Sequence, residues 1–225
     1  MHSFNKNKRK TEIAFGLLLI LAVVASLVAY ILHFDYSLPN ASMEEDLSFL
    51  KDDLPGQKIS AISSIVSGIA NLILLPSYLL LFWRFQKGMH ILNGFFILII
   101  SFAFYLTGLT ELKIVKETLA TGEDQISYLL SGNFILPAIR QIYFLQQIGL
   151  TAIGAFATVL TISRFREVRF PVFGSTLAFI AGPVIIAFTW INPEHILLTT
   201  SLAVAWTGLL IIGARLVNRG LELLN

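Results

Sequence analysis

Six apolar runs, each long enough to cross a bilayer as a helix, constrain the fold of this 225-residue chain more than any other feature. A hydrocarbon core of about 30 Å requires about 20 mainly apolar residues in helical form. Helices satisfy their own backbone hydrogen bonds, as a lipid environment demands. The sequence therefore predicts one all-α domain over residues 1–225, a polytopic membrane bundle of six transmembrane helices with short amphipathic outer segments. The expected spans are 13–34, 59–83, 91–110, 136–163, 171–191 and 196–217.

Composition excludes several classes of protein. Charged residues make up 13% of the chain, about half the share in soluble domains. The chain has no cysteine, which excludes disulfides, Cys-ligated zinc, iron–sulfur clusters and thiol catalysis. Its four histidines are scattered and form no H-x-x-x-H pair, so we predict no metal site. We also expect no cofactor and no nucleic-acid partner.

The N-terminal apolar run resembles a secretory signal peptide at first sight, because it follows a cluster of lysines and one arginine. A signal peptide has an apolar core of about 7 to 15 residues and a small-x-small cleavage site. This run is longer and ends in Tyr30-Ile31-Leu32-His33-Phe34. We interpret it as an uncleaved first span.

Charge on the connecting segments predicts the orientation. The N-terminal segment, the links after the second and fourth spans, and the C-terminal tail hold 11 of the 16 Lys and Arg, whereas the other three connections hold 4. Short loops rich in Lys and Arg stay in the cytoplasm. We therefore expect both termini in the cytoplasm of a cell whose inner membrane holds the protein, and the two long acidic segments outside. Those acidic segments would repel anions, although basic residues are commonly absent from outer loops for topological reasons alone.

The two outer segments carry amphipathic patterns. Ser42 and Glu45 resemble a capping box, and a short surface helix is expected from there to a break at Leu54-Pro55-Gly56. A solvated acidic loop is the alternative. Beyond the third span, apolar residues at helical spacing predict that the helix continues past the membrane surface until Thr121-Gly122.

The second span has a face of small and polar residues. Ser60, Ser64, Ser67 and Asn71 follow one another at intervals of four, three and four, which places them on one side of a helix. Such residues allow close helix packing or hydrogen bonding in lipid, so this face is expected to point into the bundle. Whether it lines a cavity or only packs stays open. Pro76 is expected to kink this helix.

The fourth span carries Arg140 on the same face as Gln147 and Thr151. A charged residue at a helix centre costs about 2.5–3.5 kcal/mol, so Arg140 needs a carboxylate, a cavity or the interface. Three interpretations remain open: snorkelling to the headgroups, an ion pair with Glu111, and capture of an anionic group. Gln147, rather than its neighbour Gln146, is expected to hydrogen-bond within the bundle. Tyr78, Asn71 and Thr107 are its candidate partners.

These residues together define a candidate polar intramembrane site. Its members are Arg140, Glu111, Gln147, Asn71, Ser64 and Thr151. We find no catalytic constellation, because the chain has no G-x-S-x-G elbow, no H-E-x-x-H motif and no phosphate-binding loop. The first expectation is therefore a non-enzymatic protein that packs against a partner or binds lipid through the polar faces of spans two and four. The partner would be membrane lipid, another membrane protein or a second copy of the chain.

A carrier for a small anionic or amphipathic solute is the alternative, and an intramembrane enzyme is the third choice. A continuous polar cavity reaching past mid-membrane would favour the carrier. Tight packing between Ser64, Asn71, Gln147 and Thr151 would favour the interaction protein.

Two short segments and the layout of the spans suggest a family. Residues 164–174 (RFREVRFPVFG) enter the fifth span and residues 205–213 (AWTGLLIIG) lie in the sixth, while a long outer segment follows the first. In these respects the chain resembles a family of small bacterial six-span integral membrane proteins of unknown function. The resemblance implies an all-helical bundle in a bacterial inner membrane and supplies no site residues.

Overall fold

The computed structural model describes residues 2–33, 53–82, 87–120, 135–165, 171–193 and 195–222, with side chains described from residue 10 onward. Within these ranges the chain is helical and contains no strand. All six helices are long and apolar enough to cross a membrane, so the predicted six-helix bundle is confirmed. They are α1 (His2–Ile31), α3 (Leu54–Phe82), α4 (Lys87–Ala120), α6 (Ile135–Phe165), α7 (Val172–Ile191) and α8 (Ile196–Glu222).

The start of α3 differs from the sequence prediction. Leu54-Pro55-Gly56 was expected to end a surface helix, and this prediction was wrong because the tripeptide opens α3 instead. Asp53 precedes it, and its Oδ1 accepts a hydrogen bond of 3.0 Å from the backbone N–H of Gly56. A carboxylate that accepts from the third helical N–H is a standard N-cap, and proline fits the first turn.

The expected continuation of the third span is confirmed, because α4 runs to Ala120. Along this extension Ile114 and Val115 are buried while Lys113 and Lys116 are exposed. The surface helix expected from Ser42 and the break at Thr121-Gly122 lie outside the described residues.

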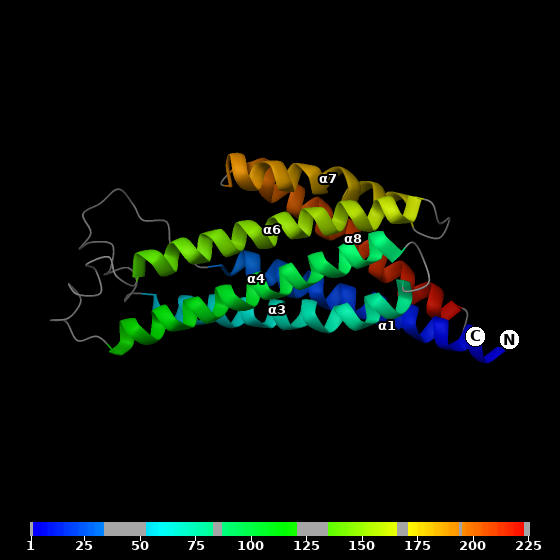
Figure 1. Cartoon of the computed structure of the whole chain (residues 1–225), viewed down its shortest axis with the longest axis horizontal. Helices are drawn as coiled ribbons and strands as arrows, with labels where there is room; N and C mark the ends of the chain where they lie inside the picture. The colour runs from blue at the N-terminus through cyan, green and yellow to red at the C-terminus, as the bar shows by residue number, and fades with distance from the viewer. Residues whose placement is uncertain are drawn as a thin grey trace.

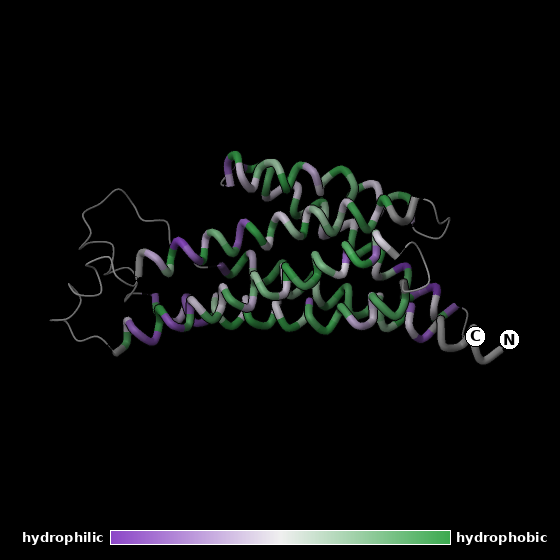
Figure 2. Tube along the Cα trace, in the orientation of Figure 1, coloured by the Kyte–Doolittle hydropathy of each residue, from purple (hydrophilic) through white to green (hydrophobic). Residues whose placement is uncertain are grey.

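The six helices form a closed ring. Each packs against the next along the chain, and α1 packs against α8 to complete the circle. Both termini lie at the same end of the bundle (Figure 1), as an even number of spans requires. Hydrophilic residues gather toward the two ends of the helices and apolar residues dominate between them (Figure 2).

The centre of the ring is filled by apolar side chains. One buried cluster draws residues from all six helices, including Leu19 of α1, Leu74 of α3, Ile97 of α4, Phe156 of α6, Ile185 of α7 and Trp206 of α8. Close packing matters here because lipid gives helices no hydrophobic reason to associate, so van der Waals contact must hold them together.

Glycines bring several helix backbones into direct contact. A Cβ added at Gly154 of α6 would lie 2.7 Å from the carbonyl oxygen of Gly182 on α7. Likewise, a Cβ at Gly208 of α8 would lie 2.6 Å from the carbonyl oxygen of Gly174 on α7. Both distances are shorter than real Cβ atoms tolerate. The absence of a side chain at these positions is therefore what allows α7 to pack against both of its neighbours.

The helices differ in length, and this shapes the end opposite the termini. α7 has 20 residues, which corresponds to about 30 Å, or one hydrocarbon thickness. α3, α4 and α6 have 29, 34 and 31 residues and extend beyond the α7–α8 turn (Figure 1). The far ends of α3, α4 and α6 therefore form a projection that α7 and α8 do not cover.

Candidate functional site

The polar residues of α3 point into the bundle, as their spacing predicts. Ser60, Ser64, Ser67 and Asn71 are all buried, with exposed fractions between 0 and 6%. They lie one above another along the helix, from the projecting end toward the middle. Asn71, toward the middle, hydrogen-bonds a neighbouring helix, whereas Ser60, at the projecting end, hydrogen-bonds the carboxylate of Glu111.

In the middle of the bundle these side chains serve packing. The Asn71 amide donates hydrogen bonds of 3.0 Å to Ser26 Oγ on α1 and 2.9 Å to the Ser67 carbonyl. The Ser26 and Ser67 hydroxyls lie 3.0 Å apart. On the other side of α3, Ser101 Oγ of α4 donates to the Gly68 carbonyl at 2.6 Å. This part of the polar face therefore joins α3 to α1 and α4.

We expect Asn71→Leu to lower bundle stability by about 1 kcal/mol, since single hydrogen bonds between membrane helices contribute about 0.6 kcal/mol on average and up to about 1.7. Ser26→Ala should cost less, because Ser67 can still pair with Asn71. Steric trapping or denaturation in mixed micelles would measure both variants and the double variant. Because Asn71 donates directly to Ser26, their effects should not add. Strict additivity would show that the two side chains do not interact.

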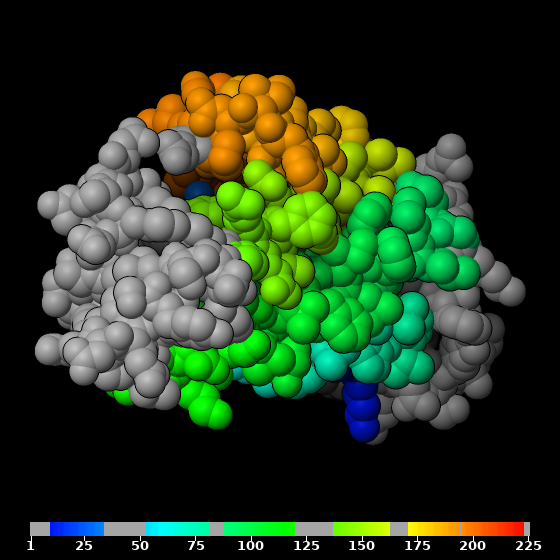
Figure 3. Space-filling model, turned by 60° about the vertical axis from the view of Figure 1, so that its left-hand side comes forward, coloured from blue at the N-terminus to red at the C-terminus, as the bar shows by residue number. Residues whose placement is uncertain are grey.

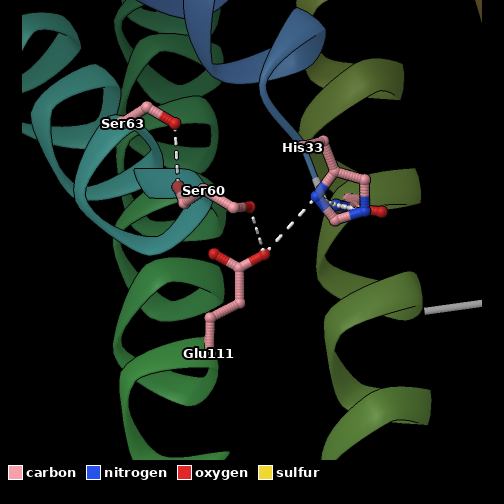
Figure 4. A network of polar contacts seen from close by, with 5 residues as sticks. His33, Ser60, Ser63 and Glu111 are labelled. Carbon is pink, nitrogen blue, oxygen red and sulfur yellow. Dashed lines mark hydrogen bonds and ion pairs between the residues drawn. The ribbon is translucent and has the colours of Figure 1, made fainter. Parts of the chain in front are cut away.

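At the projecting end, three further helices supply polar groups around Glu111 of α4 (Figure 4). Ser60 Oγ of α3 donates to Glu111 Oε1 at 2.9 Å, and His33 Nδ1, two residues beyond the end of α1, lies 3.4 Å from the same oxygen. The Gln146 amide nitrogen of α6 lies 2.8 Å from both ring nitrogens of His33. We call these four residues, Glu111, Ser60, His33 and Gln146, the Glu111 cluster.

Glu111 is fully buried, and only one of its two oxygens has a partner. Its exposed fraction is 0%, and Oε2 has no hydrogen-bond donor among the described residues. In Figure 4 this oxygen points away from His33. A buried carboxylate without a compensating cation is costly, and such sites usually hold a partner or a ligand.

The expected ion pair between Glu111 and Arg140 is not among the contacts of the described residues. Glu111 contacts His33 and Ser60 instead. Arg140 is exposed on the projecting part of α6. The physical reason is rotation around the helix: Arg140 lies six residues, about 600°, from Gln146, so the two side chains point about 120° apart.

The other members of the predicted site are also dispersed. Gln146, and not the favoured Gln147, makes the hydrogen bond within the bundle, so that prediction was wrong. The proposed glutamine partners are engaged elsewhere: Tyr78 hydrogen-bonds His90, and Asn71 bonds Ser26. Thr151 accepts a hydrogen bond of 2.9 Å from the Trp190 indole on α7. Hydrogen bonds of the polar face of α3 join it to α1 and α4, through Asn71 and Ser26 and through Gly68 and Ser101.

A small cavity of about 50 Å³ lies beside the Glu111 cluster. Five of its lining residues carry polar side chains, namely Tyr30, His33, Ser64, Thr107 and Gln146. The other lining residues are Ala29, Ala103, Phe104, Leu145, Gly149 and Leu150. The lining thus comes from α1, α3, α4 and α6 around the centre of the ring. A space of this size holds a few water molecules or one small polar group, far less than the 300–1,000 Å³ of a typical ligand pocket.

The depth of the cavity follows from two contacts with α7 and α8. Thr151 meets Trp190, which is one residue before the end of α7, and Gln146 lies about 7.5 Å further out along α6. On α1, the Tyr30 hydroxyl lies 3.2 Å from Thr199 Oγ1 in the first turn of α8. The cavity therefore sits level with the α7–α8 turn. If α7 spans the hydrocarbon core, this level is the membrane interface.

None of the cavity's described lining residues belongs to α7 or α8, both of which end at this level. In Figure 3, atoms of α1 (blue) are visible between α6 and the α7–α8 end, next to the grey atoms. Toward the middle of the bundle, in contrast, the apolar core begins directly at Leu150.

A second buried polar group lies at the end of the bundle that holds the termini. The Tyr78 hydroxyl and His90 Nδ1 are 2.9 Å apart, and both residues are buried. The predicted spans 59–83 and 91–110 leave His90 in the link between them, yet it lies within the first turn of α4. Nearby on α4, Asn93 is fully buried, and neither atom of its amide has a hydrogen-bond partner among the described residues.

The chain matches no protein-family model, no curated protein and no solved structure. The resemblance to a six-span bacterial family therefore stays a prediction. Function has to be argued from the described residues alone.

Proposed function

We propose that this protein is a non-enzymatic, multi-pass protein of a bacterial inner membrane that binds a lipid at the outer end of its bundle. The observation that supports this most is the cavity beside the Glu111 cluster. Its lining combines polar and apolar side chains at the level of the α7–α8 turn, and a lipid presents both kinds of group where its headgroup joins its acyl chains.

The filled core favours binding over transport. A carrier needs a path across the membrane, and the cavity stops at Leu150, where the apolar cluster begins. The polar face of α3 beyond that point is occupied by the hydrogen bonds of Ser67 and Asn71. The cavity could therefore hold a solute, but among the described residues it does not continue into the middle of the bundle.

Native mass spectrometry of protein extracted gently from its own membrane tests the proposal. We expect at least one phospholipid to stay bound to the wild-type chain. Ala103→Leu adds a side chain to the cavity wall, and it should reduce lipid retention several-fold. Ala203→Leu makes the same change on the exposed face of α8 and should leave retention unchanged. Equal lipid retention in both variants, or a stoichiometric partner protein in place of lipid, would refute the proposal.

The proposed orientation places the cavity on the outer side. It rests on the excess of Lys and Arg in the segments at the end that holds the termini. Because the chain has no cysteine, single cysteines can be introduced without background labelling. Cysteines replacing Ser48 or Gln125 should react with an impermeant maleimide on intact cells, whereas one replacing Lys87 should react only after lysis. The reverse pattern would invert the orientation.

A further inference from the structure

The buried carboxyl group of Glu111 indicates what kind of group the cavity accepts. Glu111 is 0% exposed, and its Oε2 has no hydrogen-bond partner among the described residues. Within the described ranges, its ion-pair contact is with His33, at 3.4 Å. Arg140 is exposed and forms no ion pair with Glu111 among the described residues. A cation bound in the neighbouring cavity would compensate the charge of this buried carboxylate.

The cavity wall also presents a hydroxyl that is ready to accept a hydrogen bond. Thr107 lies one helical turn before Glu111, on the same face of α4, and lines the cavity. Its side chain is 2% exposed, and Oγ1 has no hydrogen-bond partner among the described residues. Ser64 lies across the cavity on α3 and offers a second hydroxyl oxygen. These oxygens and the nearby carboxylate together suit a donor with several N–H groups.

We propose that the cavity binds a protonated primary amine. The ammonium group would donate hydrogen bonds to Thr107 and Ser64, while the Glu111 carboxylate balances its charge from the adjoining cluster. The volume of about 50 Å³ is large enough for an ammonium group, which is similar in size to water. A tetraalkylammonium group has no N–H and could not donate to these oxygens. The acidic outer segments add to this preference, because they attract cations toward this end of the protein.

Two sources could supply the amine: an aminophospholipid headgroup or a free alkylamine. The headgroup source rests on the proposed function, since the amine would then anchor the bound lipid. A free amine would use the same ammonium contacts with no acyl chains. Both amines would make the same contacts through the ammonium group, and the experiments below distinguish a lipid headgroup from a free amine.

The first experiment uses soluble probes on the full-length protein in mild detergent at constant ionic strength. Ethylammonium chloride should raise the melting temperature and bind measurably by calorimetry. Tetramethylammonium chloride and sodium acetate should not. Equal effects of ethylammonium and tetramethylammonium, or a stronger effect of acetate, would overturn the amine assignment.

Variants test the two groups separately. Glu111→Gln keeps the shape and the acceptor for Ser60 but removes the charge, so it should weaken ethylammonium binding at least 10-fold while the protein stays folded. Thr107→Val keeps the volume and should weaken binding several-fold. Glu222→Gln removes an exposed carboxylate at the opposite end of the bundle and should have no effect. If Glu111→Gln fails to fold, unchanged binding in Thr107→Val still overturns the proposal.

Lipid exchange separates this inference from the proposed function. The protein is incubated with vesicles of phosphatidylethanolamine, phosphatidylcholine or phosphatidylglycerol and then examined by native mass spectrometry. Selective retention of phosphatidylethanolamine that is lost in Glu111→Gln supports both the amine site and lipid binding. Retention of phosphatidylglycerol that Ala103→Leu abolishes overturns the amine assignment and leaves lipid binding intact. Binding of ethylammonium with no lipid retained supports the amine site and refutes lipid binding. If neither ethylammonium nor lipid binds, the amine site and the lipid-binding function are both refuted.

Discussion

Gly182→Leu is expected to separate α7 from α6 and to prevent recovery of folded, monodisperse protein. A Cβ at this position would lie 2.5 Å from the Gly154 carbonyl oxygen and 3.2 Å from the Thr158 backbone nitrogen. Both are backbone atoms, which cannot move aside without shifting a helix. Even small overpacking of a core costs about 1–3 kcal/mol, and leucine adds four carbons where one already collides. We therefore expect a loss of about 3 kcal/mol or more.

Size-exclusion chromatography and thermal unfolding in detergent would measure this effect. Gly88→Leu is the matched control, because a Cβ added at Gly88 meets no atom within 4 Å. It should elute and melt like the wild type. Gly182→Ala should be intermediate, since its single methyl group makes the same contact without further bulk. A Gly182→Leu protein as stable as Gly88→Leu would mean that α6 and α7 do not pack through these glycines.

These glycine contacts show where prediction from the sequence stops. Gly182 stands out as a small residue in an apolar run, yet nothing in the run indicates which helix lies opposite. The apolar runs located all six helices, because length and hydropathy are properties of each segment taken alone. Contact between two backbones depends on the mutual placement of segments far apart in the chain, and that placement carries no local periodic signal.

The same distinction separates the correct from the incorrect parts of the predicted site. The spacing of Ser60, Ser64, Ser67 and Asn71 correctly predicted one buried face, since it depends only on helical geometry. The choice between Gln146 and Gln147 required the rotation of α6 within the bundle, and adjacent residues differ by about 100°. The prediction selected the side of α6 that carries Arg140, and the contact with His33 lies on the side that carries Gln146.

His33 illustrates a third kind of miss. It ends an apolar run and is 113 residues from Gln146 in sequence, so only the folded structure reveals their contact. One signal was present: a histidine at the outer boundary of a first span and an uncompensated glutamate at the outer boundary of the third. Pairing boundary residues on the same predicted side, rather than polar residues within spans, would have proposed His33 and Glu111 as neighbours.

Tyr78→Ala is expected to cost about 3–5 kcal/mol, the usual effect of removing a large aromatic side chain from a packed core. Tyr78 is 0% exposed, and its ring centroid lies 5.8 Å from that of Phe15 and 6.3 Å from that of Phe156. Tyr78→Phe keeps these ring contacts and removes only the hydroxyl that bonds His90, so it should cost about 1 kcal/mol. The difference between the two variants measures packing apart from hydrogen bonding.

Unfolding in mixed micelles of increasing denaturing detergent would give both values. Phe102→Ala removes an aromatic ring that is 57% exposed and should have little effect. Because Tyr78 lies in the core, far along α3 from Ser64, Tyr78→Phe should also leave lipid and amine binding at the cavity unchanged. If Tyr78→Ala were no more harmful than Phe102→Ala, the centre of the ring could not be tightly packed. The argument for a binding protein over a carrier would then lose its support.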